Sequence, residues 1–207
     1  MRALFFLLVF FMLVRVHGQK LIRKAFIDPR TETIQIDAQY CYRIDLKTVL
    51  STEEVQVSAS MEGEYAKDLL VSIKERGTTA MISADFQPLF VNPNDKLSAH
   101  KVVSIVLEIS VPEFKNVEVF GTSTNVYATG KYEHLDITLS DGRCNLDNVS
   151  ESVEVTTQKG DIMLVAPSGN IDAESAYGNV EKEIIPFGYN HFILKTVEGD
   201  IFLTKTK

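Results

Sequence analysis

A pattern that recurs at an almost constant spacing in the C-terminal half constrains the fold of this chain more than any other feature of the sequence. It consists of short segments in which apolar and polar residues alternate, as they do along β-strands with one buried face. Successive segments are 18, 18, 18 and 21 residues apart and begin at Val117, Leu135, Val153, Ile171 and Phe192. The longer spacing contains an extra loop at residues 186–189. A unit this short cannot bury its apolar face alone, so the copies must stack on one another.

Each copy also contains a corner. The corner position lies seven residues after the start of each copy. It is occupied in turn by Thr124, Gly142, Gly160, Gly178 and Gly199. Glycine suits a tight corner because it adopts positive φ without a steric penalty, and we predict positive φ at Gly160 and Gly199. Apolar residues resume two positions later, at Val126, Cys144, Ile162, Val180 and Ile201. Each copy is therefore a strand, a tight corner and a second strand.

The constant spacing favours coiling over hairpins. A hairpin would reverse the chain and pair its neighbours antiparallel, whereas coiling places like residues above like residues, with strands about 4.8 Å apart. We therefore predict an all-β chain in which residues 113–207 form a parallel β-solenoid with rungs of about 18 residues. The rungs are expected to stack in the order of the sequence.

The preceding region, residues 19–112, has the same β character without a clean period. Strands are expected at residues 33–46, 54–61, 68–75, 78–86 and 102–111, and no stretch shows helical periodicity. Residues 86–101 contain Pro88, Pro93 and three Asn or Asp residues, which predicts a surface loop. Pro112 ends the last strand because proline cannot donate to a ladder. We predict that this β-rich region continues into the solenoid.

The segment 1–18 has the composition of a signal peptide. An apolar run from Ala3 to Val14 is twelve residues long and stops at Arg15. A membrane-spanning helix needs about 20 apolar residues, so this run is too short to remain as an anchor. Cleavage after Gly18 would leave Gln19 as the N-terminus, with no cysteine there to carry a lipid. We predict an exported chain with no transmembrane span, in the periplasm, at the cell surface or outside the cell.

The two cysteines, Cys41 and Cys144, could form a disulfide in an exported chain. Alternation along residues 33–46 puts Tyr40 and Tyr42 on the inward face and Cys41 on the outward face, whereas Cys144 lies in an inward column. A thiol facing out and a thiol facing in cannot be bridged without moving the backbone. We expect no disulfide between them.

The charge of the chain disfavours polyanionic partners. Loss of the signal peptide would lower Lys plus Arg from 21 to 19 against 28 Asp plus Glu, so the net charge would change from −7 to −9. Binding to nucleic acid depends on basic residues that neutralise phosphates, and the largest basic cluster here is 205–207. We therefore expect no nucleic-acid partner, and acidic polysaccharides are disfavoured for the same reason.

Several short motifs resemble those of a known family. They are the strand end Val111-Pro112 and the corners Ser140-Asp141-Gly142, Gln158-Lys159-Gly160-Asp161-Ile162 and Glu198-Gly199-Asp200-Ile201. Together they resemble the putative-adhesin family of bacterial exported β-solenoid proteins, which is related to the head GIN domain family of Bacteroidetes. The resemblance covers about residues 55–207. It implies a solenoid fold and export, and it supplies no catalytic residues.

Groups that support catalysis do not converge in the sequence. After loss of the signal peptide three histidines remain, His100, His134 and His191, at positions that look isolated and loop-like. The sequence contains no G-x-S-x-G, H-E-x-x-H or C-x-x-C motif. We therefore expect no enzyme activity and no cofactor.

Carboxylates do recur on the outward side of the rungs. The equivalent outward position of four rungs is held by Glu118, Asp136, Glu154 and Asp172. If the strands stack in register, these carboxylates form a column with neighbours about 4.8 Å apart. The simpler interpretation is a solvated acidic strip. The more specific one is a binding site for calcium or for a basic partner. A second polar column at the corners is the weaker candidate: Asn125, Arg143, Asp161, Asn179 and Asp200.

Three function classes follow from these features. The first is a non-catalytic exported binding, adhesin-like or scaffold protein of the bacterial cell envelope, with a protein or glycan partner. The second is an exported glycan-active enzyme, and the third is a cation-binding structural module. Long flat walls of stacked repeats are commonly binding surfaces, which favours the first class.

Overall fold

The computed structural model of the protein describes residues 19–50, 53–62, 68–87 and 104–206. The predicted signal peptide and most of the loop predicted at residues 86–101 lie outside the described residues. Within the described residues the chain is all-β, as predicted, with fifteen strands and no α-helix. The strands belong to one sheet, which is mostly parallel and not closed, and which continues across Pro112 because β2 pairs with β8 and β3 with β9.

The bounds of the strands are β1 Gln19–Phe26, β2 Thr33–Asp37, β3 Cys41–Val49, β4 Glu54–Glu62, β5 Leu69–Arg76, β6 Thr79–Phe86, β7 Ser104–Pro112, β8 Asn116–Gly121, β9 Asn125–Leu139, β10 Cys144–Thr157, β11 Ile162–Ala166, β12 Asn170–Ser175, β13 Val180–Lys182, β14 His191–Thr196 and β15 Ile201–Lys205. The predicted strands at 54–61, 68–75, 78–86 and 102–111 are confirmed to within two residues as β4 to β7. Strand β1 was not predicted.

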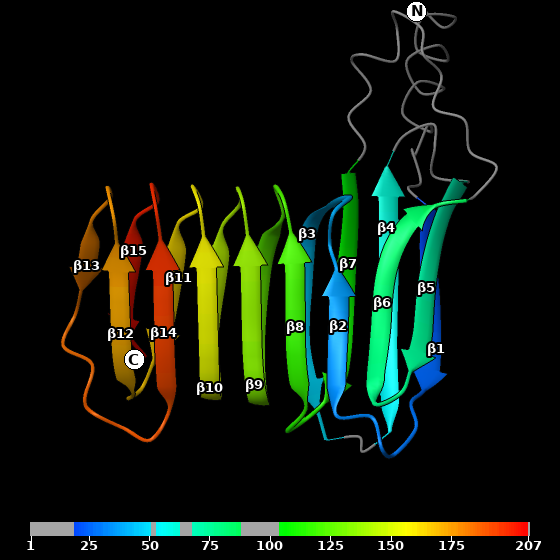
Figure 1. Ribbon diagram of the computed structural model, residues 1–207, viewed down its shortest axis with the longest axis horizontal. Helices are drawn as coiled ribbons and strands as arrows, with labels where there is room; N and C mark the ends of the chain where they lie inside the picture. The colour runs from blue at the N-terminus through cyan, green and yellow to red at the C-terminus, as the bar shows by residue number, and fades with distance from the viewer. Residues whose placement is uncertain (1–18, 51–52, 63–67, 88–103, 207) are drawn as a thin grey trace, which may run out of the picture.

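The strands form two layers that face each other (Figure 1). The first layer runs β1-β4-β7-β3-β9-β10-β11-β15-β13. The second layer runs β5-β6-β2-β8-β9-β10-β14-β12. Strands β9 and β10 are long, and each contributes its first half to the first layer and its second half to the second. The apolar side chains that alternate along most of the strands meet between the layers and form the core.

The predicted repeat register is confirmed where β8, β9, β10 and β11 meet. Leu135 is paired with both Val117 and Val153, and Cys144 with both Val126 and Ile162. All these side chains are buried, because strand pairing in register places each apolar residue above its equivalent. Cys144 is fully buried in the column that the spacing predicts.

The last two repeats do not stack in the order of the sequence. Strand β14 lies between β10 and β12, and β15 lies between β11 and β13, so the final repeat is inserted between the third and the fourth. Burial gives the reason. The inserted repeat brings Phe192 and Ile201, which are fully buried, whereas the displaced repeat has Ala173 and Lys182 at core positions and loses less by lying at the edge.

The segment that forms β2 and β3 is inserted in a similar way. Strand β2 lies between β6 and β8, and β3 lies between β7 and β9. The strand predicted at 33–46 is broken by a turn at Gln39 and Tyr40, which shifts the alternation. Cys41 is therefore buried and Tyr40 is 47% exposed, opposite to the prediction. Both cysteines are free.

The corner glycines are required for a different reason from the one predicted. Positive φ occurs at Gly142 but not at Gly160 or Gly199, so the prediction for these two was wrong. Instead, the corners of neighbouring repeats stack so closely that a Cβ at Gly160 would overlap the carbonyl oxygen of Gly142. In the same way, a Cβ at Gly199 would overlap the carbonyl oxygen of Gly160.

Candidate functional site

Three of the four predicted carboxylates form a column on the outer side of the second layer. Glu118 is paired with Asp136, and Asp136 with Glu154, on the adjacent strands β8, β9 and β10. The next residue along the column is Ile193 of β14, which separates Glu154 from Asp172. The predicted stacking is therefore confirmed for the first three residues and wrong for Asp172, because the inserted repeat lies between them.

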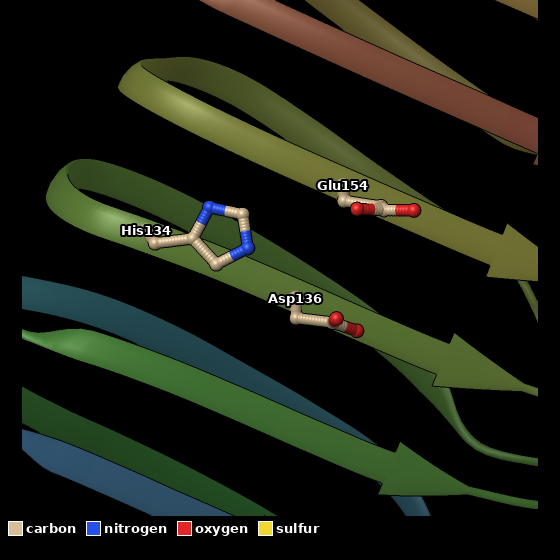
Figure 2. Close-up of side chains that lie close together, drawn as sticks. All are labelled: His134, Asp136 and Glu154. Atoms are coloured by element: carbon tan, nitrogen blue, oxygen red, sulfur yellow. The ribbon is translucent and has the colours of Figure 1, made fainter.

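A histidine joins this column. His134 lies two residues before Asp136 on the same side of β9, and Glu154 reaches across from β10 (Figure 2). One ligand atom from each of the three side chains lies within 4.8 Å of the others, and all three residues are half-buried. The prediction that His134 is isolated in a loop was wrong. The signal was present in the sequence, because residues i and i+2 of a strand share one face.

Neighbouring side chains fix the orientation of two members of this cluster. The Nδ1 atom of His134 lies 3.0 Å from Oγ of Ser152, and the second ring nitrogen lies on the side of the carboxylates (Figure 2). The Thr138 hydroxyl donates to Oδ1 of Asp136 at 3.3 Å. An imidazole nitrogen with two carboxylates is a ligand set for a divalent transition metal, and an outer hydrogen bond of this kind typically orients a ligating histidine.

The other two histidines do not extend this cluster. His100 lies outside the described residues, and Nδ1 of His191, on β14, lies 3.2 Å from Nδ2 of Asn170 on β12. The His134, Asp136 and Glu154 cluster is the one group of this kind in the described part of the chain.

The second predicted column, at the corners, is occupied by internal bonds. The amide of Arg143 donates to Oδ1 of Asn125 at 3.1 Å, and its guanidinium pairs with Asp161 at 3.5 Å. The amide of Asp200 donates to Asp161 at 3.1 Å, and that of Asn179 donates to Asp200 at 2.7 Å. These side chains hold one corner to the next, so their role is structural.

A hollow of about 380 Å³ lies on the outer side of the first layer, over β4, β7, β3 and β9. Sequence reasoning did not find it. Its lining is rich in hydroxyl, amide and charged groups and includes one aromatic ring: Gln56, Ser58, Glu108, Ser110, Asp45, Lys47, Tyr127 and Thr129. These side chains come from four strands and are spread over residues 45–129, which is why no local motif marks them.

Arg43 holds the aromatic wall of this hollow in place. Its Nη2 pairs with Oδ1 of Asp45 at 2.7 Å, and its Nε lies 3.0 Å from both carboxylate oxygens. The hydrogen bond to Asp45 raises the pKa of Arg43. The same guanidinium lies 4.1 Å from the centre of the Tyr127 ring, in cation–π contact. Tyr127 is 36% exposed, so part of its side chain remains open to a ligand.

The second layer carries a hollow of similar size with a different lining. It measures about 400 Å³ over β5, β6, β2 and β8, and Met81 and Phe120 are exposed in it. These two hollows lie on opposite layers and differ in polarity.

Comparison with solved structures identifies the fold. A "putative cell adhesion protein" from Clostridium sporogenes superimposes with a TM-score of 0.64 at 12% identity, covering 92% of this chain and all of the other. A "putative adhesin" from Bacteroides fragilis is 12% identical and aligns over 93% of this chain and all of the other, with a TM-score of 0.41. No family model matches the sequence, and no curated protein matches it. The chain shares its fold with the Clostridium protein.

No helix in the described residues is long and apolar enough to cross a membrane.

Proposed function

We propose that this chain is an exported, non-catalytic binding protein of the bacterial cell envelope, adhesin-like in its role and built as a β-solenoid. The repeat register, the parallel pairing and the signal-like segment that precedes Gln19 support this proposal. The shared fold with a protein described as a putative cell adhesion protein supports it at the level of the fold. The partner binds on the flat outer walls, as is usual for stacked repeats.

The observation that carries the proposal is the polar hollow beside Tyr127. In this hollow one fixed aromatic ring is surrounded by hydroxyl, amide and carboxylate groups. Such a site suits a ligand that has many hydroxyl groups and an apolar face, as a sugar ring does. The ring stacks on the apolar face of the sugar, and the surrounding groups exchange hydrogen bonds with its hydroxyls. Because the exported chain would have a net charge of −9, the ligand is a neutral glycan rather than an acidic one.

Isothermal titration calorimetry with a panel of neutral and acidic oligosaccharides tests this function. We expect at least one neutral glycan to bind and to be recovered uncleaved. Tyr127→Ala should weaken that binding at least tenfold, whereas Phe120→Ala, an equally exposed aromatic on the opposite layer, should leave it unchanged. Cleavage of the glycan would favour the enzyme alternative. Binding that is lost only with Phe120→Ala would move the site to the other hollow, and no binding at all would refute the glycan assignment.

A second candidate function is cation binding by His134, Asp136 and Glu154. The nitrogen ligand favours Zn²⁺ over Ca²⁺, which takes oxygen ligands. A cation that binds only the folded state raises the melting temperature by mass action. We expect such a rise with Zn²⁺ that disappears in His134→Ala, while His191→Ala retains it. An equal rise in both variants would show that the cation binds elsewhere.

A further inference from the structure

The two layers end in four strands that have a partner on one side only. Strands β1 and β5 lie at one end of the molecule, and β12 and β13 lie at the other (Figure 1). Each therefore presents unpaired backbone N–H and C=O groups along its outer side, and such edges are ready to pair with another chain. No described strand covers either end.

The core is also incompletely covered at both ends. At the β1/β5 end Leu21 and Ile73 are only partly buried, and a hollow of about 320 Å³ opens between the two strands. At the β12/β13 end Ile171 is partly buried and Val180 is 37% exposed, next to a hollow of about 270 Å³. Both ends thus expose apolar surface that a second molecule could bury.

The two ends carry opposite charge. The exposed charged side chains of β1 and β5 are those of Arg23, Lys24, Lys74 and Arg76 against Glu75 alone. Those of β12 and β13 are Asp172, Glu174 and Glu181 against Lys182 alone, with Glu183 directly after. Some of these groups have internal partners: Lys24 pairs with Glu54 at 3.1 Å, Glu75 accepts from the amide of Asp28, and Glu183 accepts from the amide of Lys205. The excess of each sign remains.

We propose that copies of this protein associate head to tail, with the β1/β5 end of one copy on the β12/β13 end of the next. Two like ends would repel each other, which disfavours a symmetric dimer, whereas unlike ends attract. The strand directions allow both ladders to form: β1 would pair with β13 in parallel and β5 with β12 antiparallel. A contact between different ends leaves one free end of each kind, so the association continues into a linear chain.

Paired charge reversals test this proposal on the chain recovered after export. One variant reverses the basic end (Arg23→Glu and Lys74→Glu), and the other reverses the acidic end (Asp172→Lys and Glu181→Lys). Each variant alone has two ends of the same sign, but a mixture of the two restores opposite signs at every junction. Circular dichroism first establishes that both variants are folded.

Sedimentation and negative-stain microscopy at low salt then give the outcome. We expect the unaltered chain to form linear assemblies that grow with concentration and dissociate at high salt, each variant alone to remain monomeric, and the equimolar mixture to assemble again. An unaltered chain that stays monomeric at all concentrations overturns the proposal. Assembly by either variant alone, or a mixture that stays monomeric, overturns it as well, because the contact would then not join unlike ends.

Discussion

Equivalent core positions in the middle of the stack and at its edge differ sharply in burial. Ile162 and Ile201 are fully buried, whereas Val180, at the same position of another repeat, is 37% exposed. All three follow their corner by two residues and belong to short strands of the same pattern. The pattern therefore determines that a strand forms and which side faces inward. The place of the repeat in the stack determines how much the burial of that side stabilises the fold.

The largest difference is expected from Ile162→Asp compared with Val180→Asp. Asp at position 162 would bury a charge without a partner between Cys144 and Ile201, at a cost of several kcal/mol against a total stability of about 5–15 kcal/mol. Asp at the exposed position 180 remains solvated. Chemical denaturation at high salt, where the chain is expected to be monomeric, should show the first variant unfolded or close to it and the second within about 1 kcal/mol of the parent. Similar losses in both would mean that the edge is covered in solution.

A smaller difference is expected from glycines in the stacked corners and in an open turn. Gly160→Ala places a methyl group against the backbone of the neighbouring corner, which must move, at a cost of about 3 kcal/mol. Gly77, at φ +64°, has no atom within 4 Å of a Cβ position, so Gly77→Ala costs only the backbone strain of about 1 kcal/mol. Thermal unfolding of the two variants measures the difference, and a larger loss for Gly77→Ala would contradict the close stacking.

The two thiols test how completely the core excludes water. Burial, and secondarily Asp37, raises the pKa of Cys41 from about 9 to about 12, and burial raises the pKa of Cys144 as well. A raised pKa in the folded state favours folding below pH 9, and that contribution is lost as the pH rises towards 12. The free energy of unfolding should fall by about 1.4 kcal/mol per pH unit and thiol in this window.

The control for this pH dependence is the double variant Cys41→Ala and Cys144→Ala. It should show a shallower decline above pH 9 than the parent in urea titrations at each pH. An unchanged slope would mean that the decline comes from other groups. In the parent, neither thiol should react with a labelling reagent until the chain is unfolded.

The smallest effect is expected where two corners are joined by an exposed ion pair. Lys159 and Glu198 are 3.4 Å apart, and both side chains are more than half exposed. Lys159→Ala should therefore change stability by less than about 0.5 kcal/mol. In the same corner, the buried Thr157 hydroxyl donates to the Gly160 carbonyl oxygen at 2.6 Å, and Thr157→Val should cost about 1–3 kcal/mol. A reversed order of the two would show that surface charge, rather than the interior, holds the corners together.

The part of the fold that could be predicted is the part where neighbours in sequence are neighbours in space. The repeats that begin at Val117, Leu135 and Val153 follow one another in the sequence and also lie side by side in the sheet. Their spacing alone therefore predicts the register of their strands. The insertion of β14 and β15 could not be read from spacing, because both orders place like residues above like. The available cue was side-chain size: Ala173 and Lys182 form a weak core surface beside Phe192 and Leu203.

The two candidate sites also differ in how far they could be predicted from the sequence. The stacking of Glu118, Asp136 and Glu154 follows from the repeat, and His134 could have been added from its spacing to Asp136. The hollow beside Tyr127 could not be anticipated, since Ser58, Glu108 and Asp45 meet there through strand pairings that follow no period.

The inserted repeats have a consequence for how the chain reaches this state. During synthesis β12 and β13 emerge before their native neighbours β14 and β15, and the free edges available to them are those of β10 and β11. Docking there would be out of place by one repeat. The chain must either wait for the segment that begins at His191 or separate a pairing already made. We therefore expect that folding does not proceed as a simple zipper from one end and that its slow step involves the C-terminal strands, since long-range pairing has to precede the local one.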